Sequence, residues 1–452
     1  MLGTGLNVPL LRPESSFGRT ASSALRQLRR HRAGRNPELA VADHGPPAEG
    51  PPAEGPADEP PAEQVPLATI AGQWARMGII GFGGPPAHIV LLRTLCVDNR
   101  RWLSAREFED GLAAANLMPG PASTQLAIFC AWKLRGAAGA VLGGACFIVP
   151  GLIIILALAA LFLAGSPPLW VQGAAAGAGA AVPAVAVQAA VSLLPASRKR
   201  MGARRAARAR WLAYLAAGAA ASATAGPFVV AVLLACGLAE VAVQLRAAPG
   251  PSSGLPAGGV LGGLPSLAGP AVAAGGIGAL AWVAIKVGAL SFGGGFVIIP
   301  LMQHDAVVTY HWMTGAQFLN AVALGQVTPG PVVLTVAVVG YAAAGIGGGL
   351  LAALIAFLPS FMFVIAGGPH LGRLRASRRA QSFLSGSGAA AIGAIAGAAI
   401  PLGLELGHLW QAALLLLAAG WLLALRRGIV TALLYSAGLG VIAVLAGAPL
   451  GH

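Results

Sequence analysis

The stretch Phe82-Gly83-Gly84-Pro85-Pro86 interrupts an apolar sequence with residues that break helices. A second interruption, Met118-Pro119-Gly120-Pro121, follows in the next apolar segment. Both recur 210 residues later, as Phe292-Gly293-Gly294-Gly295 (82 to 292) and as Thr328-Pro329-Gly330-Pro331 (119 to 329). The chain is therefore predicted to contain two homologous halves, each carrying two helix breaks.

The composition is that of a membrane protein. The chain has 452 residues, of which 56% are hydrophobic and only 10% are charged, and its mean hydropathy is +0.75. A soluble domain carries about 25% charged residues. Apolar stretches of roughly 20 residues, enough to span a bilayer as helices, recur after Leu67. A spanning β-barrel would instead alternate polar and apolar residues, so the predicted fold class is an all-α polytopic membrane protein.

The formal net charge of +14 does not indicate a nucleic-acid partner. The arginines lie in the first tail and in short loops between apolar segments, where they set the orientation of a membrane protein. The four cysteines show no CxxC spacing, and three of them lie in apolar runs, as small packing residues do. No metal site and no cofactor are expected.

Composition also divides the chain into four parts. Residues 1–66 contain a basic stretch and the low-complexity run GPPAEGPPAEGPADEPPAE, which cannot bury a core, so we expect a disordered cytoplasmic tail. The first half is assigned to residues 67–246 and the second half to residues 271–452. A linker rich in Pro, Gly and Ser, residues 247–270, joins them.

Loop charges predict that the two halves have opposite orientations. The loop from Arg93 to Arg106 is basic, but its counterpart, Gln303 to Ala316, has no Lys or Arg. The basic loop from Arg198 to Arg210 likewise corresponds to Pro401 to His408, which has none. Because Lys and Arg stay on the cytoplasmic side, the halves are predicted to form an inverted repeat. The broken segments would then be re-entrant hairpins, and one unpaired crossing is expected within Leu267 to Ile285.

The breaks can bind an anion through backbone groups. A lipid-facing helix cannot expose unpaired N–H or C=O groups, so a break needs protein or a water-filled cavity beside it. Glycines at the FGG motifs let backbone N–H groups approach a ligand, and Pro121 and Pro331 would begin half-helices whose free N–H groups favour a small anion. Paired breaks in inverted halves are typical of secondary transporters. A simple kink or a close helix crossing is the structural alternative.

Polar side chains near the breaks have two interpretations each. Arg76 and Lys286 occupy matching positions and would either attract an anion or extend to the interface. Asn116 and Gln326, also matched, would donate to an oxyanion or pair with freed backbone. His88 is a site residue or a structural histidine. The predicted substrate-binding residues are Arg76, Phe82, Gly83, Gly84, His88, Asn116, Pro119, Gly120, Pro121, Lys286, Phe292, Gly293, Gly294, Gln326, Pro329, Gly330 and Pro331.

At these motifs the chain resembles the chromate ion transporter (CHR) family of bacterial inner-membrane proteins, in its long-chain, two-domain form. The matching elements in the first half are GIIGFGGPPAHIVLLR and NLMPGPASTQLAIF. Those in the second half are GALSFGGGFVIIPLM and ALGQVTPGPVVLTVAVVGY. The likeness covers about Ala68 to Leu445, and Asn116 stands where the family pattern has glutamine.

The resemblance implies a multi-pass protein of the inner membrane that exports chromate and confers chromate resistance. It also implies a proton gradient or membrane potential as driving force, and sulfate as a competing or alternative substrate. A transporter of another small oxyanion and a passive anion channel are the alternatives. An enzyme is not expected, since the apolar segments carry no HExxH or GxGD motif. A homodimer is one arrangement that the sequence leaves open.

The acidic residue Asp305 has two interpretations as well. It lies in the sparsely charged loop between the two breaks of the second half. A carboxylate there would either couple transport to protons or be an ordinary loop charge.

Overall fold

A computed structural model describes residues 65–116, 118, 120–163, 167–202, 204–224, 228–247, 276–291, 298–367 and 377–450. The predicted tail lies outside these ranges except for Val65 and Pro66, and the predicted linker lies outside them except for Ala247. Pro119, Phe292, Gly293 and Gly294 of the predicted site also lie outside the described residues.

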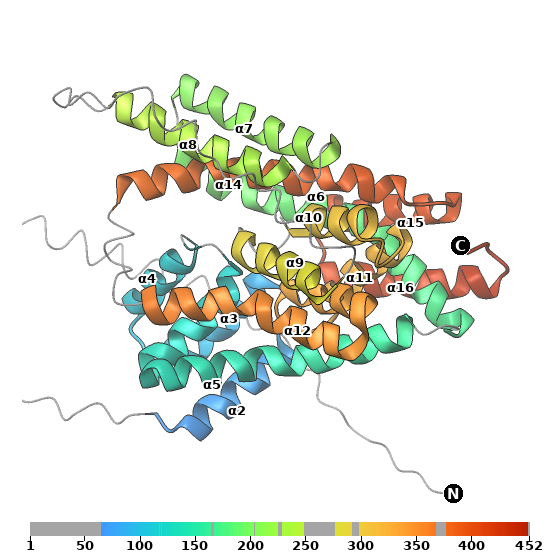
Figure 1. Cartoon of the computed structure of the whole chain (residues 1–452), viewed down its shortest axis with the longest axis horizontal. Helices are drawn as coiled ribbons and strands as arrows, with labels where there is room; N and C mark the ends of the chain where they lie inside the picture. The colour runs from blue at the N-terminus through green and yellow to red at the C-terminus, as the bar shows by residue number, and fades with distance from the viewer. Residues whose placement is uncertain are drawn as a thin grey trace, which may run out of the picture. The chain divides into compact units, whose positions relative to one another are not determined.

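Every regular element of the described residues is helical (Figure 1). The first half contains α2 Leu67–Ile80, α3 Pro85–Arg93, α4 Ala105–Ala115, α5 Ala122–Phe162, α6 Leu169–Met201, α7 Arg205–Thr224 and α8 Val229–Ala247. The second half contains α9 Ile277–Leu290, α10 Ile298–Gln303, α11 Gly315–Val327, α12 Thr335–Gly367, α14 Arg378–Leu404, α15 Leu409–Ala419 and α16 Ile429–Leu445.

The internal repeat extends to the details of the backbone. Helices α2 and α9 each have 14 residues. Their C-cap residues, Gly81 and Ser291, have nearly the same φ/ψ angles, −76°/63° and −75°/66°. A capping box begins both α4, at Ser104, and α11, at Thr314. In each box the side chain of the capping residue accepts a hydrogen bond from the backbone N–H three residues later, and the side chain of that later residue accepts one from the backbone N–H of the capping residue. The two halves are thus the same fold, as predicted.

The second break of the first half lies in a re-entrant hairpin. Helix α4 has 11 residues, which extend about 16 Å and reach roughly halfway through a hydrocarbon core about 30 Å thick. Helix α5 is interrupted at Arg135 and Gly136, where its φ/ψ angles are not helical. Lys133 Nζ lies 3.5 Å from Glu107 Oε1, so the end of this short arm returns to the start of α4. The chain therefore enters and leaves on one side.

The first break lies in a second hairpin of the same kind. After the FGG motif, α3 leads the chain back, because Arg93 Nη1 lies 3.4 Å from Glu109 Oε1 on α4. The ring of Trp102, beyond α3, also stacks on that of Trp74 in α2, with 6.5 Å between centroids. The prediction of broken, re-entrant helices is confirmed for both motifs of the first half.

One detail of the predicted register is wrong. A constant spacing of 210 pairs Arg135 with Gly345, but the backbone pairs it with Ala344. Arg135 and Gly136 have φ/ψ angles of −147°/28° and 58°/−147°, and Ala344 and Gly345 have −153°/31° and 63°/−156°. The second half is therefore one residue shorter between its PGP motif and this turn.

Contacts between the halves show the inversion directly. Along α5 and α12, Gly144 lies against Phe361, whereas Leu156, further along α5, lies against Gly349, which comes earlier in α12. Two corresponding helices that pack in this order run antiparallel. The inverted repeat is thus confirmed.

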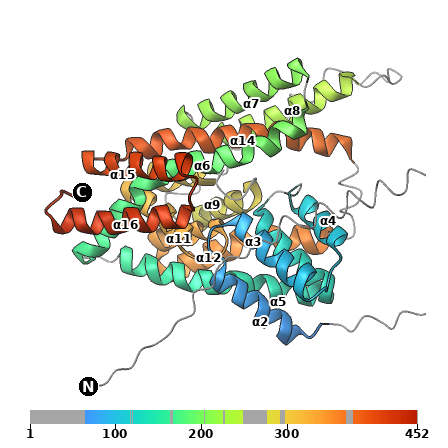
Figure 2. The same cartoon turned by 180° about the vertical axis from the view of Figure 1, so that it is seen from behind.

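The outer helices of each half pack on the other half. Helices α7 and α8 lie along α14, and α15 and α16 lie along α6 (Figures 1 and 2). Small residues make these approaches close: a Cβ atom at Gly218 of α7 would meet the backbone of Ala390, and one at Gly177 of α6 would meet that of Ser436. The two halves are therefore interlocked.

Within the described ranges, five helical segments are long and apolar enough to cross a bilayer: Ala122–Phe162, Leu169–Met201, Val229–Arg246, Val332–Gly367 and Arg378–Leu404. This supports the polytopic membrane fold. The expected unpaired crossing at Leu267 to Ile285 is corrected in part. Its portion from Ile277 belongs to α9, which is the counterpart of α2 and not an additional element. Residues 267–275 lie outside the described ranges.

Basic residues gather at one end of the helices, which we call the basic end. Arg200 at the end of α6 and Arg378 and Arg379 at the start of α14 line one opening there. Arg200 and Glu109 of α4 line another, so the first-half hairpins open toward the same end.

Reporter insertions test the inversion. We expect a topology reporter at Arg100 to lie on the same side as one at Arg200, and one at Tyr310 to lie on the opposite side, because corresponding loops of inverted halves face opposite compartments. Paired reporters active on either side of the membrane measure this. The same location for Arg100 and Tyr310 would refute the inverted arrangement.

Candidate anion-binding site

A cavity of about 350 Å³ lies beside both helix breaks of the first half and α11 of the second half. Four predicted site residues line it: Gly83 and Gly84 from the first break, Asn116 from the end of α4, and Gln326 from α11 of the second half. Its other walls come from α6 and α14, including the polar residues Gln188, Ser192, Ser197, Arg200, Ser385 and Ser387.

The first break is held open by glycine. Gly84 has φ/ψ angles of 72°/−156°, a conformation that is essentially restricted to glycine. It precedes Pro85, which begins α3 with the φ angle that a helix requires. A Cβ atom at Gly84 would lie 3.7 Å from Val332 Cγ2, so this break also borders the second half.

The N-terminus of α5 borders the cavity. It starts at Ala122, immediately after Pro121, and Ala122 lines the cavity. The first N–H groups of an α-helix have no partner inside the helix, and the positive end of its dipole lies with them. This arrangement is suited to binding an anion. Gly120, which precedes it, is buried and lies close to Ser360 of α12.

The PGP break of the second half joins the halves and lies beside the cavity. The Gly330 N–H donates a hydrogen bond to the Gly81 carbonyl oxygen, at 3.1 Å, which connects it to the FGG break of the first half. Pro331 precedes a 3₁₀ turn, Val332–Leu334, and then α12. Pro329 and Pro331 do not line the cavity.

The two matched amides differ in what they bind. Asn116 is exposed, and its Nδ2 donates to the Leu112 carbonyl oxygen of its own helix, at 2.9 Å. Gln326 is 6% exposed, and its buried Nε2 has no hydrogen-bond partner among the described residues. A buried donor without a partner costs free energy, so Gln326 is the residue here that would gain from a bound acceptor.

The contacts of His88 are those of a structural histidine. It is fully buried, with Nε2 2.9 Å from the Gly81 carbonyl oxygen and Nδ1 3.3 Å from Ser123 Oγ. Its ring packs edge-on against Phe147. Because Gly81 also accepts from Gly330, His88 supports the junction of the two breaks without lining the cavity.

Three further predicted residues do not line the cavity. Arg76 and Phe82 are exposed and do not line it. Lys286 Nζ forms an ion pair with Asp305 Oδ2, at 2.6 Å, and lies over the ring of Trp282. Asp305 is therefore a paired carboxylate that connects its segment to α9. Arg76 matches Lys286 in position but not in environment, because the first half has Leu95 at the position that corresponds to Asp305.

The sequence did not indicate the walls of the cavity. Gln188 and Ser192 of α6, with Ser385 of α14, lie in apolar segments that carry no repeated motif. Arg200 belongs to a basic stretch whose sequence indicates only the orientation in the membrane. Among the described residues, no group of three or more His, Cys, Asp or Glu side chains lies together as a metal site requires.

Comparison with known proteins agrees with this architecture. The family model described as chromate transporter matches residues 68–241 and 278–447, one region in each half. The chromate transport protein of Cupriavidus metallidurans is 32% identical over 345 residues, which cover 74% of this chain and 82% of that protein. The chromate transport protein of Pseudomonas aeruginosa is 31% identical over 353 residues, covering 73% and 79%.

A more distant relative is the probable chromate transport protein of Synechococcus elongatus, which is 29% identical over 352 residues, covering 76% of this chain and 86% of that protein. No solved structure matches the chain. The matched regions contain both pairs of helix breaks and leave out the first 67 residues. The chain therefore belongs to the chromate transporter family, in its two-domain form.

Proposed function

We propose that this protein exports chromate from the cytoplasm across the bacterial inner membrane, as a secondary transporter whose substrate binds in the cavity at the helix breaks. One observation carries the proposal: the Gln326 Nε2, which has no hydrogen-bond partner among the described residues, lies in a cavity that is also lined by the glycine break of the other half. A site built from both halves of an inverted repeat changes when the halves move against each other.

The donors suit a tetrahedral dianion. The N–H groups at the start of α5 and the Gln326 amide supply hydrogen bonds, which are stronger when the acceptor is charged. Backbone and amide donors recognise oxygen atoms and not the central atom, so sulfate is the expected competitor. Residues of both halves of one chain line the cavity, so a homodimer is not required to complete it.

The basic end supports the proposed direction of transport. Lys and Arg remain on the cytoplasmic side, and the cavity reaches the basic end at Arg200. A cavity that opens toward this end supports loading of the anion from the cytoplasm. Export would remove chromate from the cell and confer resistance.

Flux measurements in everted membrane vesicles test this function. We expect energised vesicles that contain the protein to accumulate chromate above the external concentration, and sulfate to compete. Vesicles from cells without the protein are the control. A passive channel would bring chromate only to equilibrium, with no response to a proton gradient or membrane potential. The absence of any protein-dependent chromate flux would refute the proposal altogether.

A further inference from the structure

Two further openings lie beside the cavity at the basic end, and Arg200 lines both of them as well as the cavity. One opening has a volume of about 430 Å³ and is also lined by Arg378, Arg379 and Glu240. The other has about 520 Å³ and is also lined by Asn116, which belongs to the cavity too. The mouth of the cavity is therefore bordered by guanidinium groups from α6 and α14.

These guanidinium groups have no ion-pair partners within the described part of the chain. Arg200, Arg378 and Arg379 are all exposed, and none of them forms a salt bridge there. Glu109 borders the second opening but pairs with Arg93. The mouth therefore carries uncompensated positive charge.

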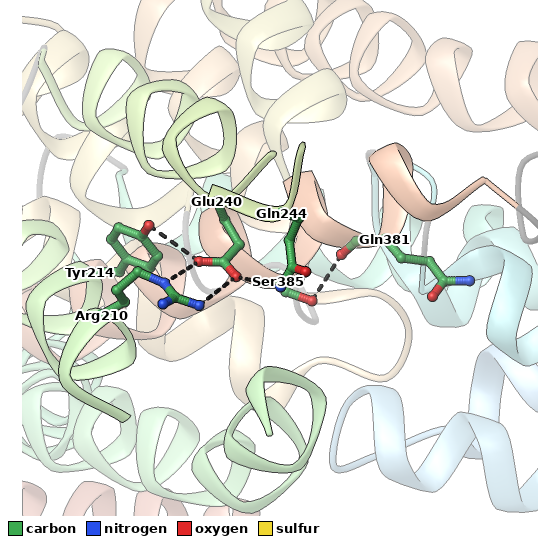
Figure 3. A network of polar contacts seen from close by, with 6 residues as sticks. All are labelled: Arg210, Tyr214, Glu240, Gln244, Gln381 and Ser385. Atoms are coloured by element: carbon green, nitrogen blue, oxygen red, sulfur yellow. Dashed lines mark hydrogen bonds and ion pairs between the residues drawn. The ribbon is translucent and has the colours of Figure 1, made fainter. Parts of the chain in front are cut away.

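Among the described residues, one carboxylate, that of Glu240, lines the opening beside Arg378, and its charge is already neutralised. Glu240 is 1% exposed and accepts hydrogen bonds from Arg210 Nε at 2.9 Å and Arg210 Nη2 at 3.2 Å (Figure 3). Tyr214 Oη and Gln244 Nε2 also donate to it, at 3.3 Å and 3.1 Å. With its acceptor positions occupied from α7 and α8, Glu240 neither pairs with the arginines at the mouth nor repels an anion from them.

We propose that Arg200, Arg378 and Arg379 form a capture site that holds a tetrahedral dianion at the mouth before it moves to the helix breaks. This inference rests on the proposed function. A guanidinium group presents parallel N–H donors that match two oxygens of an oxyanion. Like charges gathered in a recess between low-dielectric walls raise the local concentration of a counter-ion.

The capture site is present on one side only. The loop after Arg198 corresponds to Pro401 to His408, which has no Lys or Arg. The turn that roughly corresponds to the region before α14, Ser166-Pro167-Pro168, is also neutral. An anion would therefore be concentrated at the basic end and not at the opposite end, which favours loading in the direction of export.

A matched pair of variants separates capture from orientation. Arg198→Gln and Arg200→Gln remove the same charge from the same end of α6, but Arg198 does not line the cavity or either opening. Both change the orientation signal equally. The measurement is the initial rate of chromate flux in everted vesicles, as KM and maximal rate, at low and high ionic strength, with the protein level determined by immunoblot.

We expect Arg200→Gln to raise KM about fivefold at low salt, from Coulomb's law for a dianion about 8 Å away in water, with the maximal rate unchanged. The double variant Arg378→Gln/Arg379→Gln should raise KM further, and Arg200→Lys should restore most of the loss. These differences should shrink at high salt. Arg198→Gln should match the unaltered protein.

The possible failures are distinguishable. Equal KM values for Arg198→Gln and Arg200→Gln, or a KM effect that does not depend on salt, would overturn the capture site while leaving the transporter intact. If the unaltered protein gives no chromate flux, the proposed function itself fails, and the capture site fails with it.

Discussion

Replacement of Gln326 by leucine is expected to lower chromate transport by at least tenfold while the amount of protein in the membrane stays the same. Loss of a hydrogen bond to a charged group costs about 1.5–3 kcal/mol, which corresponds to roughly a tenfold to hundredfold effect. The fold should not suffer, because the Gln326 Nε2 has no partner among the described residues and leucine removes a buried unpaired donor. Thermal unfolding in detergent, followed beside flux in everted vesicles, measures both.

The matched residue of the first half provides the control. Asn116→Leu should lower transport less than threefold, because the Asn116 amide already donates to Leu112 and its side chain is exposed. Equal losses from the two variants would show that the Gln326 amide has no particular role. A Gln326→Leu protein that transports normally would remove the observation on which the proposed function depends.

A leucine at Gly84 is expected to abolish transport. Gly84 lines the cavity and lies beside Val332, so a branched side chain there would fill space between the two halves. Part of the effect comes from backbone strain, because a residue other than glycine in this conformation costs on the order of 1–3 kcal/mol. Strain alone could reduce the amount of folded protein, so the measurement must be flux per molecule in the membrane.

The turn at Gly136 separates strain from obstruction. Its φ/ψ angles of 58°/−147° are close to the 72°/−156° of Gly84, but a Cβ atom there would meet nothing within 4 Å. Gly136→Leu should therefore introduce similar strain and leave flux per molecule near normal. If both leucine variants lose flux equally, the effect of Gly84→Leu comes from the backbone alone and the cavity is not the route.

The breaks and the inversion could be predicted from the sequence because each has a local signal. Glycine and proline interrupt helices wherever they occur in such motifs, and the spacing of 210 places α2 and α9 in register at both ends. Loop charges gave the opposite orientations that the α5 and α12 contacts show. Asn116 and Gln326 were found because they precede the PGP motifs, and both line the cavity.

The environment of each side chain could not be predicted in the same way. Arg76 and Lys286 occupy matching positions, yet among the described residues only Lys286 forms an ion pair with a carboxylate. The residue that decides this, Asp305 or Leu95, lies on another element. The walls from α6 and α14 depend on how the halves pack, which no local pattern encodes. The contacts of His88 with Gly81 and Ser123 depend on the same packing.

The interlocked packing of the outer helices bears on how the protein is made. Helices α7 and α8 pack on α14, which leaves the ribosome only after most of the second half has been synthesised. Until then, the surface of α7 at Gly218, which later lies against Ala390, is without its partner. The first half therefore cannot complete its packing before the second half is made. Its membrane-inserted segments stay accessible to chaperones and quality-control proteases until α14 has been translated.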